Sequence, residues 1–276
     1  MIKAAFFDID GTLLSFNTHK VSEGTVRAFE RLHAAGVHTF ISSGRPMVLI
    51  PPMPVSFEAY ITMNGGLVFT NDECGMMNDE QAAAPRHSSL ITHRSTLISN
   101  PIPDADRDAW VDFARQHNLC TMTFTADGMM ASQINEVGNA LRNQLEFQMP
   151  PVVDIEQFRN ETSYQIIAIM PAELDSRVGA FMPHCRLPRW HPAFTDIVAA
   201  GNSKAVGMEA ICRHFGIRRE ETIAFGDGGN DIEMLQWAGV GIAMGNAEES
   251  VKQHADLVTT DVDSEGIENA VNQLLS

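Results

Sequence analysis

Residues 4–12 read AAFFDIDGT, a short apolar run that ends in two acidic residues followed by Gly-Thr. The run favours a β-strand. On a strand, Asp8 and Asp10 would point to the same face, because side chains alternate with a period of two. Gly11 then allows a tight turn. Two neighbouring carboxylates at the end of a buried strand repel each other and are costly to desolvate, unless a cation or a shared proton relieves them. The stretch therefore indicates either a cation-dependent site or a solvated acidic turn.

The size and charge of the chain limit its class. It has 276 residues, 44% of them hydrophobic, which is enough for one large globular domain or two ordinary ones. Its 19 basic and 35 acidic residues give a formal net charge of −16. A protein that binds nucleic acid or an anionic membrane would carry a basic surface, so neither partner is expected.

The cysteines and the apolar runs bear on the compartment. The four cysteines are far apart and form no CxxC pair: Cys74, Cys120, Cys185 and Cys212. Free thiols in a reducing compartment are the favoured interpretation, with disulfides or a metal site as the alternative. No apolar run approaches the ~20 residues of a membrane span, and no charged-then-apolar leader pattern precedes the first expected strand. A soluble cytoplasmic protein is expected.

Strand-like and helix-like segments alternate in the first and last parts of the chain. The expected strands are 4–9, 37–42, 59–62, 222–225 and 240–243. The expected helices are 22–36, 203–215, 231–238, 247–254 and 266–275. This alternation predicts an α/β fold whose core is a Rossmann-like, doubly wound parallel sheet covered by helices.

The regular alternation of expected strands and helices stops in the middle of the chain. The expected elements there are two helices at 104–117 and 135–147, a hairpin at 119–132, a strand at 164–170, a short helix at 174–181, and strands at 189–190 and 194–198. We interpret this block as a separate α+β module inserted into the alternating domain. The predicted division is a core of residues 1–80 and 191–276 and an inserted cap of residues 81–190.

Four segments of the alternating parts carry polar residues where a ligand could bind. They are Asp8–Thr12, Ser42–Arg45, the helix start at Lys204, and Gly226–Asp231. Ligands of open α/β sheets bind at the carboxyl ends of the strands, near the switch in strand order, so these segments can converge. Each segment alone has an ordinary interpretation as a turn, a helix cap or a solvated lysine. Together they supply what phosphoryl transfer to a carboxylate requires: a nucleophile, a proton donor, oxygen ligands for a cation, and donors around the phosphate.

These motifs, Asp-x-Asp-Gly-Thr followed far along the chain by Gly-Asp-x-x-Asn-Asp, with Ser-Gly-Arg and Lys204 between them, resemble those of the haloacid dehalogenase superfamily of phosphotransferases. The insert between the second and third segments is similar to the type-two cap of the Cof-type subgroup. The resemblance covers nearly the whole chain. It implies a Mg²⁺-dependent phosphatase.

The resemblance implies a role for each matching residue. Asp8 is the expected nucleophile, which would form an aspartyl-phosphate that water hydrolyses. Asp10 is expected to protonate the leaving oxygen and then to activate the water. Ser43 and the N–H of Gly44 are expected to hold the phosphate oxygens. Lys204 is expected to balance the charge of the nucleophile and the phosphate.

The same resemblance implies a magnesium site built from oxygen ligands. Asp227 is the expected distal ligand and Asp231 a direct or indirect one, beside Asp8 and the backbone carbonyl of Asp10. Asn230 is expected to contact the phosphate or to orient the lysine. Mg²⁺ suits this set because it prefers hard oxygen ligands, of which few come from protein and the rest from water and phosphate.

The motifs do not identify the residues that select the substrate. The candidates are the cap residues Asp127, Gly128, Arg189, Trp190 and His191, and the core residues Arg45, Asn64 and Gly65. An extra segment around residues 76–95 has two interpretations, a cap-edge loop that reaches the substrate or an idle solvated loop.

The expected function is hydrolysis of a small phosphorylated metabolite, with a sugar phosphate as the expectation that the family carries. Two alternatives stay open. One is a phosphomutase of the same superfamily, which would need a bisphosphate activator and return the phosphoryl group to a sugar hydroxyl. The other is a non-catalytic protein that binds a phosphorylated metabolite, and the complete set of catalytic residue types argues against it. The chain is expected to be a monomer or a homodimer.

Overall fold

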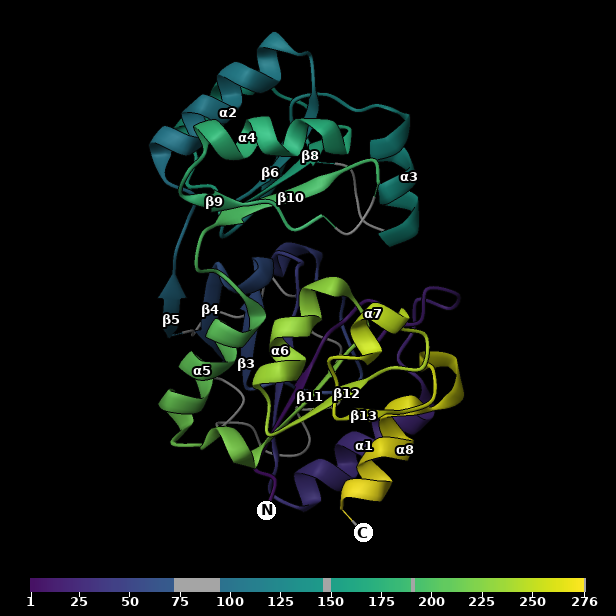
Figure 1. Ribbon diagram of the computed structural model, residues 1–276. Helices are drawn as coiled ribbons and strands as arrows, with labels where there is room; N and C mark the ends of the chain where they lie inside the picture. Colours follow the sequence, from purple (N-terminus) through teal and green to yellow (C-terminus); the bar gives the residue numbers. More distant parts are fainter. Residues whose placement is uncertain (72–94, 146–149, 190–191, 276) are drawn as a thin grey trace.

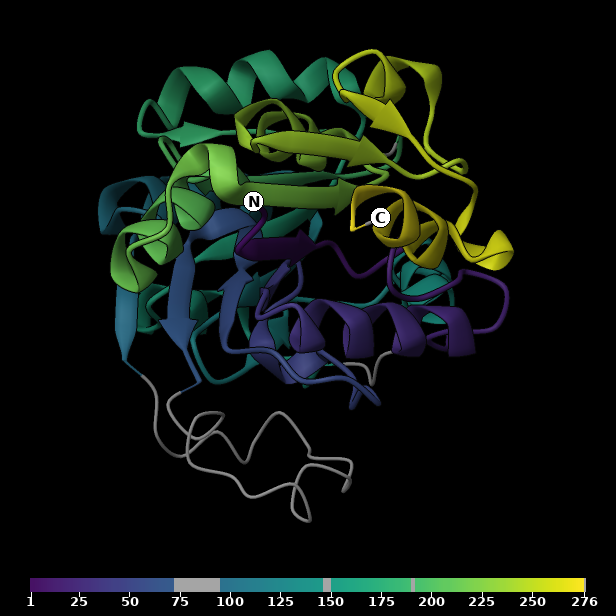
Figure 2. The same cartoon turned by 90° about the horizontal axis from the view of Figure 1, so that it is seen from below.

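The computed structural model describes residues 1–71, 95–145, 150–189 and 192–275, and it consists of two stacked parts (Figure 1). The lower part is built on an eight-stranded sheet and the upper part on a five-stranded sheet. Both chain termini lie at the end of the lower part that is farthest from the upper one (Figures 1 and 2). The first strand therefore runs toward the upper part.

The lower sheet has the strand order β13-β12-β11-β1-β2-β3-β4-β5. Its strands are β1 (Ala4–Phe7), β2 (His38–Ser42), β3 (Ala59–Thr62), β4 (Leu67–Thr70), β5 (Thr96–Ser99), β11 (Thr222–Gly226), β12 (Val240–Ala243) and β13 (Leu257–Val258). The strands from β13 to β3 are parallel, and β4 and β5 continue the sheet in antiparallel pairing. The parallel part confirms the predicted α/β core.

Helices cover both faces of the lower sheet because β1 is apolar on both. Phe7 packs in one cluster with Phe29 of α1 and Val271 of α8, whereas Phe6 packs in another with Met208 of α5 and Leu235 of α6. The helices are α1 (Glu23–Ala34), α5 (Lys204–Phe215), α6 (Ile232–Trp237), α7 (Glu249–Lys252) and α8 (Gly266–Leu274). The sheet is thus doubly wound, as alternating strands and helices predict.

The upper part is an antiparallel sheet in the order β7-β6-β8-β10-β9. Its strands are β6 (Cys120–Phe124), β7 (Met129–Ala131), β8 (Gln165–Ile169), β9 (Cys185–Arg186) and β10 (Thr195–Ala199), and its helices are α2 (Asp104–Gln116), α3 (Glu136–Leu145) and α4 (Asp175–Phe181). Ile166 packs with Trp110 of α2 and Val178 of α4 on the outer face, whereas Ile167 belongs to the cluster that joins the lower part. We call this upper part the cap.

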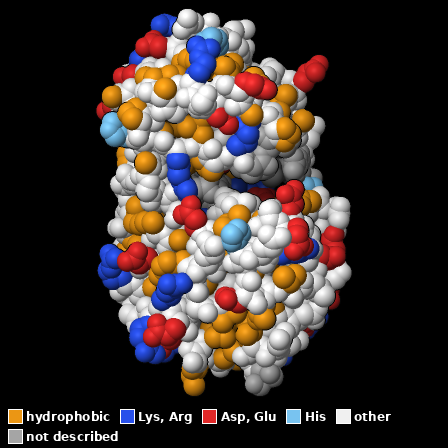
Figure 3. Space-filling view, in the orientation of Figure 1, with side chains coloured by type: hydrophobic (Ala, Val, Ile, Leu, Met, Phe, Trp, Pro, Cys, Tyr) orange, Lys and Arg blue, Asp and Glu red, His pale blue; other side chains and the backbone are white. Residues whose placement is uncertain are grey.

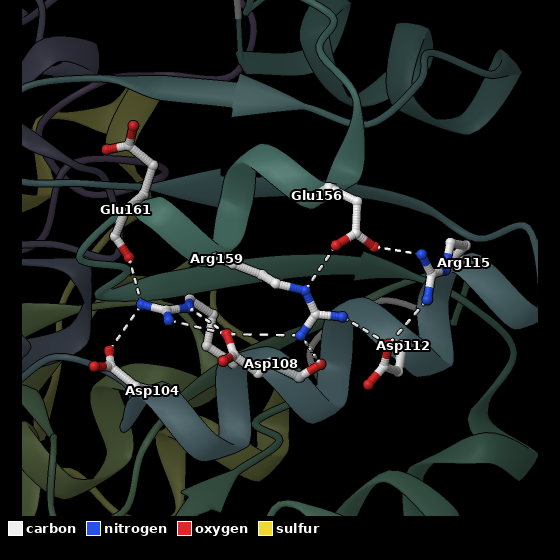
Figure 4. A network of polar contacts seen from close by, with 8 residues as sticks. Asp104, Asp108, Asp112, Arg115, Glu156, Arg159 and Glu161 are labelled. Carbon is white, nitrogen blue, oxygen red and sulfur yellow. Dashed lines mark hydrogen bonds and ion pairs between the residues drawn. The ribbon is translucent and has the colours of Figure 1, made fainter.

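Ion pairs bind α2 to the 3₁₀ segment Ile155–Asn160 on the outside of the cap (Figure 4). Arg159 donates to Glu156 at 2.8 Å and to Asp112 at 2.6 Å, and Arg115 pairs with Glu156 at 2.6 Å. Charges of both signs alternate through the network, so each carboxylate has a cationic neighbour. Because the groups are largely exposed, their contribution to stability is modest and depends on salt.

Strand pairing corrects the predicted domain boundaries. The positions 80/81 and 190/191 lie outside the described residues, but the strands beside them are placed. β5 pairs with β4 in the lower sheet, and β10 pairs with β8 and β9 in the cap. The chain therefore crosses between the sheets near residues 100–103 and 200–203. The backbone hydrogen bonds of β5 and β10 determine this division, and hydrophobic rhythm alone does not reveal which sheet an apolar strand joins.

The strand expected at 189–190 is absent at Arg189, and β10 pairs instead with β8 and with β9, which ends at Arg186. In the described part of the chain, no helix combines the length and the apolar character that crossing a membrane requires.

Candidate active site

The site lies where three neighbouring parallel strands end. Asp8 follows β1, Ser43 follows β2, and Asp227 follows β11, and these strands are adjacent in the order β11-β1-β2. Lys204 begins α5, whose N-cap is Ser203. The surface is hollowed between the two parts of the molecule, with acidic and basic side chains beside the hollow (Figure 3). The structure thus brings the four predicted segments together at the carboxyl edge of the sheet.

Lys204 is a buried lysine held by two carboxylates. Its Nζ donates to Oδ1 of Asp8 and to Oδ1 of Asp231, both at 2.6 Å, and its side chain has no exposed surface. Burial alone would lower the pKa of Lys204, but the charges of Asp231 and Asp8 outweigh burial and raise the pKa above its ordinary value. The lysine is therefore a fixed positive charge beside Asp8.

Three carboxylates surround this single charge. Oxygen atoms of Asp8, Asp227 and Asp231 lie within 4.8 Å of one another. Burial, and then the charge of Asp231, raise the pKa of Asp8 well above 3.8. The same two causes raise the pKa of Asp227 to about 7. Both shifts express an excess of buried negative charge, which a divalent cation would offset. The oxygen donors and their spacing fit Mg²⁺, because that cation prefers hard oxygen ligands.

Asp227 is held by Thr12 and Asn246, two side chains to which the sequence motifs assign no role. Thr12 donates from Oγ1 to Oδ1 of Asp227 at 3.1 Å, and Asn246 donates from Nδ2 to Oδ2 at 3.1 Å and to the carbonyl of Gly11 at 2.9 Å. Gly11 has a φ of +79°, and a Cβ there would lie 2.1 Å from Oδ2 of Asp227. Asn246 follows β12, the next parallel strand, and that position at a strand end was the available sequence signal.

Asp231 organises the loop that carries Asp227. Its Oδ2 accepts backbone N–H groups of Asp227 at 3.0 Å and Gly228 at 2.9 Å, while its Oδ1 accepts from Lys204. Both carboxylate oxygens therefore have protein donors. These contacts join the loop after β11 to the start of α5 through one buried side chain.

Asp10 is directed toward Arg45. The guanidinium donates from Nε to Oδ2 at 2.8 Å and from Nη2 to Oδ1 at 2.7 Å, and from Nη1 to the carbonyl of Leu49 at 2.7 Å. The carboxylate oxygens of Asp10 are not part of the three-carboxylate group formed by Asp8 and its neighbours. Arg45, expected at the pocket entrance, binds the predicted acid–base residue.

The loop after β2 lies beside two asparagines. The Oγ of Ser43 accepts the backbone N–H of Arg45 at 3.1 Å. A Cβ added to Gly44 would lie 3.3 Å from the side-chain amide of Asn64 and 3.5 Å from Nδ2 of Asn230. Asn230 donates to Oδ1 of Asn64 at 3.1 Å. Ser43, Gly44 and Asn230 are therefore gathered in one corner, with Asn64 as an additional member.

Among the cap candidates, the structure describes Arg189, Asp127 and Gly128. Arg189 pairs with both oxygens of Asp175 at 2.8 and 2.6 Å and donates to the carbonyl of Phe194, so its described contacts are within the cap. Asp127 and Gly128 form the turn between β6 and β7. Trp190, His191 and nearly all of the 76–95 segment lie outside the described residues.

Comparison with known proteins places these features in a family. The model of the haloacid dehalogenase-like hydrolases matches residues 5–87 and 89–271. The chain is 29% identical to a putative phosphatase, YkrA of Bacillus subtilis, over 99% of this chain and 97% of that protein. It is 27% identical to the B. subtilis 5-amino-6-(5-phospho-D-ribitylamino)uracil phosphatase YitU, with coverage of 98% and 96%. The solved structure of a subclass IIB sugar phosphatase, BT4131, superposes with a TM-score of 0.84 at 34% identity, over 99% of this chain and 98% of that one.

Proposed function

Since the chain belongs to the haloacid dehalogenase-like hydrolases, we propose that it hydrolyses a sugar phosphate in a Mg²⁺-dependent reaction, through an aspartyl-phosphate on Asp8. It is an enzyme of the phosphomonoester hydrolase class. The observation that carries the proposal is the buried group of three carboxylates with Lys204 hydrogen-bonded to Asp8 at 2.6 Å. Hydrolysis of a phosphate ester through a covalent intermediate requires a nucleophile and a fixed positive charge beside it. Asp8 supplies the nucleophile in this group, and Lys204 supplies the charge.

Asp8 performs the first displacement in the proposed reaction. Its carboxylate oxygen forms a bond to phosphorus while the ester P–O bond breaks, and the leaving oxygen takes a proton. Water then attacks phosphorus, the bond between phosphorus and Asp8 breaks, and phosphate leaves. Lys204 offsets the repulsion between the carboxylate and the phosphate dianion, and its two hydrogen bonds fix the ammonium in place before substrate binds.

Asp10 supplies and recovers the proton in this scheme. It must carry a proton for the first half-reaction and accept one from water in the second. Both Asp10 oxygens accept N–H groups of Arg45, so the oxygen that takes up the proton has to leave its Arg45 contact, and Arg45 orients the carboxyl group through the other. Ser43, whose Oγ accepts from the backbone, keeps its hydroxyl proton for a phosphate oxygen, next to the N–H of Gly44.

The carboxylates of Asp8 and Asp227 and the backbone carbonyl of Asp10 would hold Mg²⁺. When bound, the ion supplies positive charge that reduces the repulsion between phosphate and carboxylate. We assign Asp231 to positioning, because both of its oxygens accept protein donors. Asn230 contributes to the phosphate corner through its contact with Asn64.

Three observations support the finer parts of the proposal. The sugar phosphatase BT4131 is similar over 99% of the chain, which supports a sugar phosphate as substrate. The free thiols of Cys120, Cys185 and Cys212 support a reducing, cytoplasmic location. The formal net charge of −16 argues against nucleic acid or an anionic membrane as a partner.

The test is phosphate release from a panel of phosphorylated metabolites with MgCl₂ or with EDTA, using Asp8→Asn as the control. We expect release that requires Mg²⁺ and that falls below about a tenth of the wild-type rate in the variant. A folded Asp8→Asn enzyme that keeps more than that rate overturns the nucleophile. Isomerisation of a sugar phosphate that needs an added sugar bisphosphate and proceeds without phosphate release identifies a phosphomutase, and silence in both assays favours a binding protein.

A further inference from the structure

Two polar side chains of the cap sheet face the lower part. On β8, Ile166 points outward to α2 and α4, so Gln165 points the other way, toward the lower sheet. On β10, Ile197 belongs to the same outer cluster, which directs Asp196 to the inner face. Gln165 and Asp196 are each only 4% exposed. Their inner-face neighbours include the apolar Ile167.

Asn64 reaches across from the lower part to both of these side chains. Its Nδ2 lies 3.3 Å from Oε1 of Gln165 and 3.5 Å from Oδ2 of Asp196, and it is 2% exposed. The same side chain accepts from Asn230 at 3.1 Å. We call Asn64, Gln165 and Asp196 the bridging cluster. It is a buried polar group on a cap face that also carries Ile167 and Arg186, and Arg186 pairs with Glu233 of α6 at 2.6 Å.

The bridging cluster adjoins the proposed phosphate corner. The backbone N–H of Asn64 donates to the carbonyl of Ser43 at 3.1 Å, and its side chain lies 3.3 Å from where a Cβ of Gly44 would be. Asn64 has a φ of +53°, in the left-handed region that asparagine tolerates better than most residues. A phosphate bound at Ser43 and Gly44 would therefore have its ester substituent near the cluster and the cap.

The chemistry of the cluster is that of a hydrogen-bond acceptor with negative charge. The oxygens of Gln165 and Asp196 accept O–H groups, and adjacent hydroxyls of a polyol are suitable donors. A second anionic group there would meet the Asp196 carboxylate in a buried place. The basic side chains described on the two facing parts are already engaged: two carboxylates hold Lys204, Asp10 holds Arg45 and Glu233 holds Arg186.

We propose that the bridging cluster selects the leaving group: it accepts hydroxyls of an uncharged sugar or polyol and rejects leaving groups that carry a carboxylate or a second phosphate. This inference rests on the proposed phosphatase function. It adds which residues select the leaving group and the rule that they reject a leaving group with a negative charge. Rejection of like charge is a repulsive element, which specificity commonly needs besides attractive contacts. Bisphosphates are disfavoured by the same rule, in agreement with hydrolysis instead of mutase activity.

The experiment compares matched substrates. Glycerol 3-phosphate and 3-phosphoglycerate differ by a hydroxymethyl group against a carboxylate, and sorbitol 6-phosphate and 6-phosphogluconate differ in the same way. For wild type we expect kcat/KM to favour the neutral member of the better-hydrolysed pair by about tenfold or more. Asp196→Asn should reduce this ratio by about tenfold, and Gln165→Glu, which adds a charge, should increase it.

A matched control is Glu173→Gln, which removes one charge from an exposed cap residue and should leave the ratio unchanged. Equal loss on both members in Asp196→Asn, or a shift of the ratio as large in the control, overturns the inference. If thermal melting shows that Asp196→Asn does not fold, the kcat/KM ratio of Gln165→Glu decides. An increase over the wild-type ratio supports the inference, and no increase overturns it.

Failure of the proposed function has a different signature, because wild type would then release no phosphate from these substrates or from p-nitrophenyl phosphate. In that case calorimetric binding of the same pairs to wild type and Gln165→Glu tests the charge rule. Preference for the neutral member that increases in the variant supports the inference, and equal binding of both members overturns it.

Discussion

Arg45 and Asp10 form a two-point ion pair beside the proposed nucleophile, with Nε–Oδ2 and Nη2–Oδ1 distances of 2.8 and 2.7 Å. The geometry defines the plane of the Asp10 carboxyl group as well as its position, which a single hydrogen bond would not do. The third donor of Arg45 is fixed on the carbonyl of Leu49 at 2.7 Å. The segment after β2 therefore orients the proposed acid–base group of the loop after β1.

We predict that Arg45→Lys lowers kcat by about 10- to 100-fold, because an ammonium group cannot reproduce the planar two-point contact and small displacements of a proton donor are costly. KM for Mg²⁺ should change little, since the side-chain contacts that define the role of Arg45 are with Asp10 and the carbonyl of Leu49. Steady-state kinetics at saturating Mg²⁺ measure both quantities. Arg213→Lys, at an exposed pair on α5, is the control. An unaltered kcat in Arg45→Lys contradicts the positioning role.

We predict that Asn246→Ala raises the Mg²⁺ concentration for half-maximal activity by about tenfold, because the variant loses the donor to Oδ2 of Asp227. The exposed Asn139→Ala on α3 should leave the magnesium titration where it is in wild type. The readouts are a Mg²⁺ titration of phosphate release and, for folding, the thermal midpoint in EDTA. If the titration curve stays in place, Asn246 has no part in the metal site.

We predict that Glu221→Gln removes a component of acid-dependent stability. Hydrogen bonds from Arg218, and then from Lys3, lower the pKa of Glu221 from 4.5 to about 2. A carboxyl group with a lowered pKa in the folded state contributes stability that is complete above its unfolded pKa and is lost as the pH falls toward the folded value. The thermal midpoint of wild type should therefore exceed that of the variant above about pH 4.5, and the difference should shrink between pH 4.5 and 2.

The matched control for that experiment is Glu209→Gln, which changes an exposed carboxylate paired with Arg213 on α5. Its midpoint should follow the wild-type curve over the whole range. A difference between wild type and Glu221→Gln that stays constant from pH 7 to pH 2 would show that the variant acts through packing and not through ionisation.

We predict that Cys185 and Cys212 resist alkylation in the folded protein at pH 8. Burial raises the pKa of both thiols to about 12, and for Cys185 the neighbouring Asp106 adds to the effect of burial. Because the thiolate is the reactive form, iodoacetamide should label these positions far more slowly in the native protein than after unfolding. Peptide mass spectrometry resolves each cysteine. Native labelling as fast as in denaturant would refute the assignment.

The sequence allowed the core of the site to be predicted because its residues stand at the ends of parallel strands. Asp8 and Asp227 each follow an apolar run, and such runs in alternation with helices predict adjacent strand ends on one edge. Lys204 was predicted from its helix start and from the family resemblance. The structure places its Nζ 2.6 Å from Asp8, although the two residues are 196 positions apart.

Local sequence patterns do not show which strands, distant along the chain, pair with one another. β10 reads as an apolar strand that could join either sheet, and only its hydrogen bonds with β8 and β9 assign it to the cap. The strand expected at 189–190 does not form at Arg189 for a similar reason, since a strand needs the backbone groups of a neighbouring strand and Arg189 enters no sheet.

The order of strands and helices, the two-part organisation and the acidic strand ends follow from periodicity and from residue type, which act over a few positions along the chain. The contact of Arg45 with Asp10, the support of Asp227 by Asn246 and the meeting of Asn64 with Asp196 depend on how separate elements pack. Such contacts join residues from 19 to 132 positions apart, so they exist only once the sheets have been assembled. The class of reaction can therefore be predicted from the sequence, whereas the residues that surround the leaving group are determined by the tertiary structure.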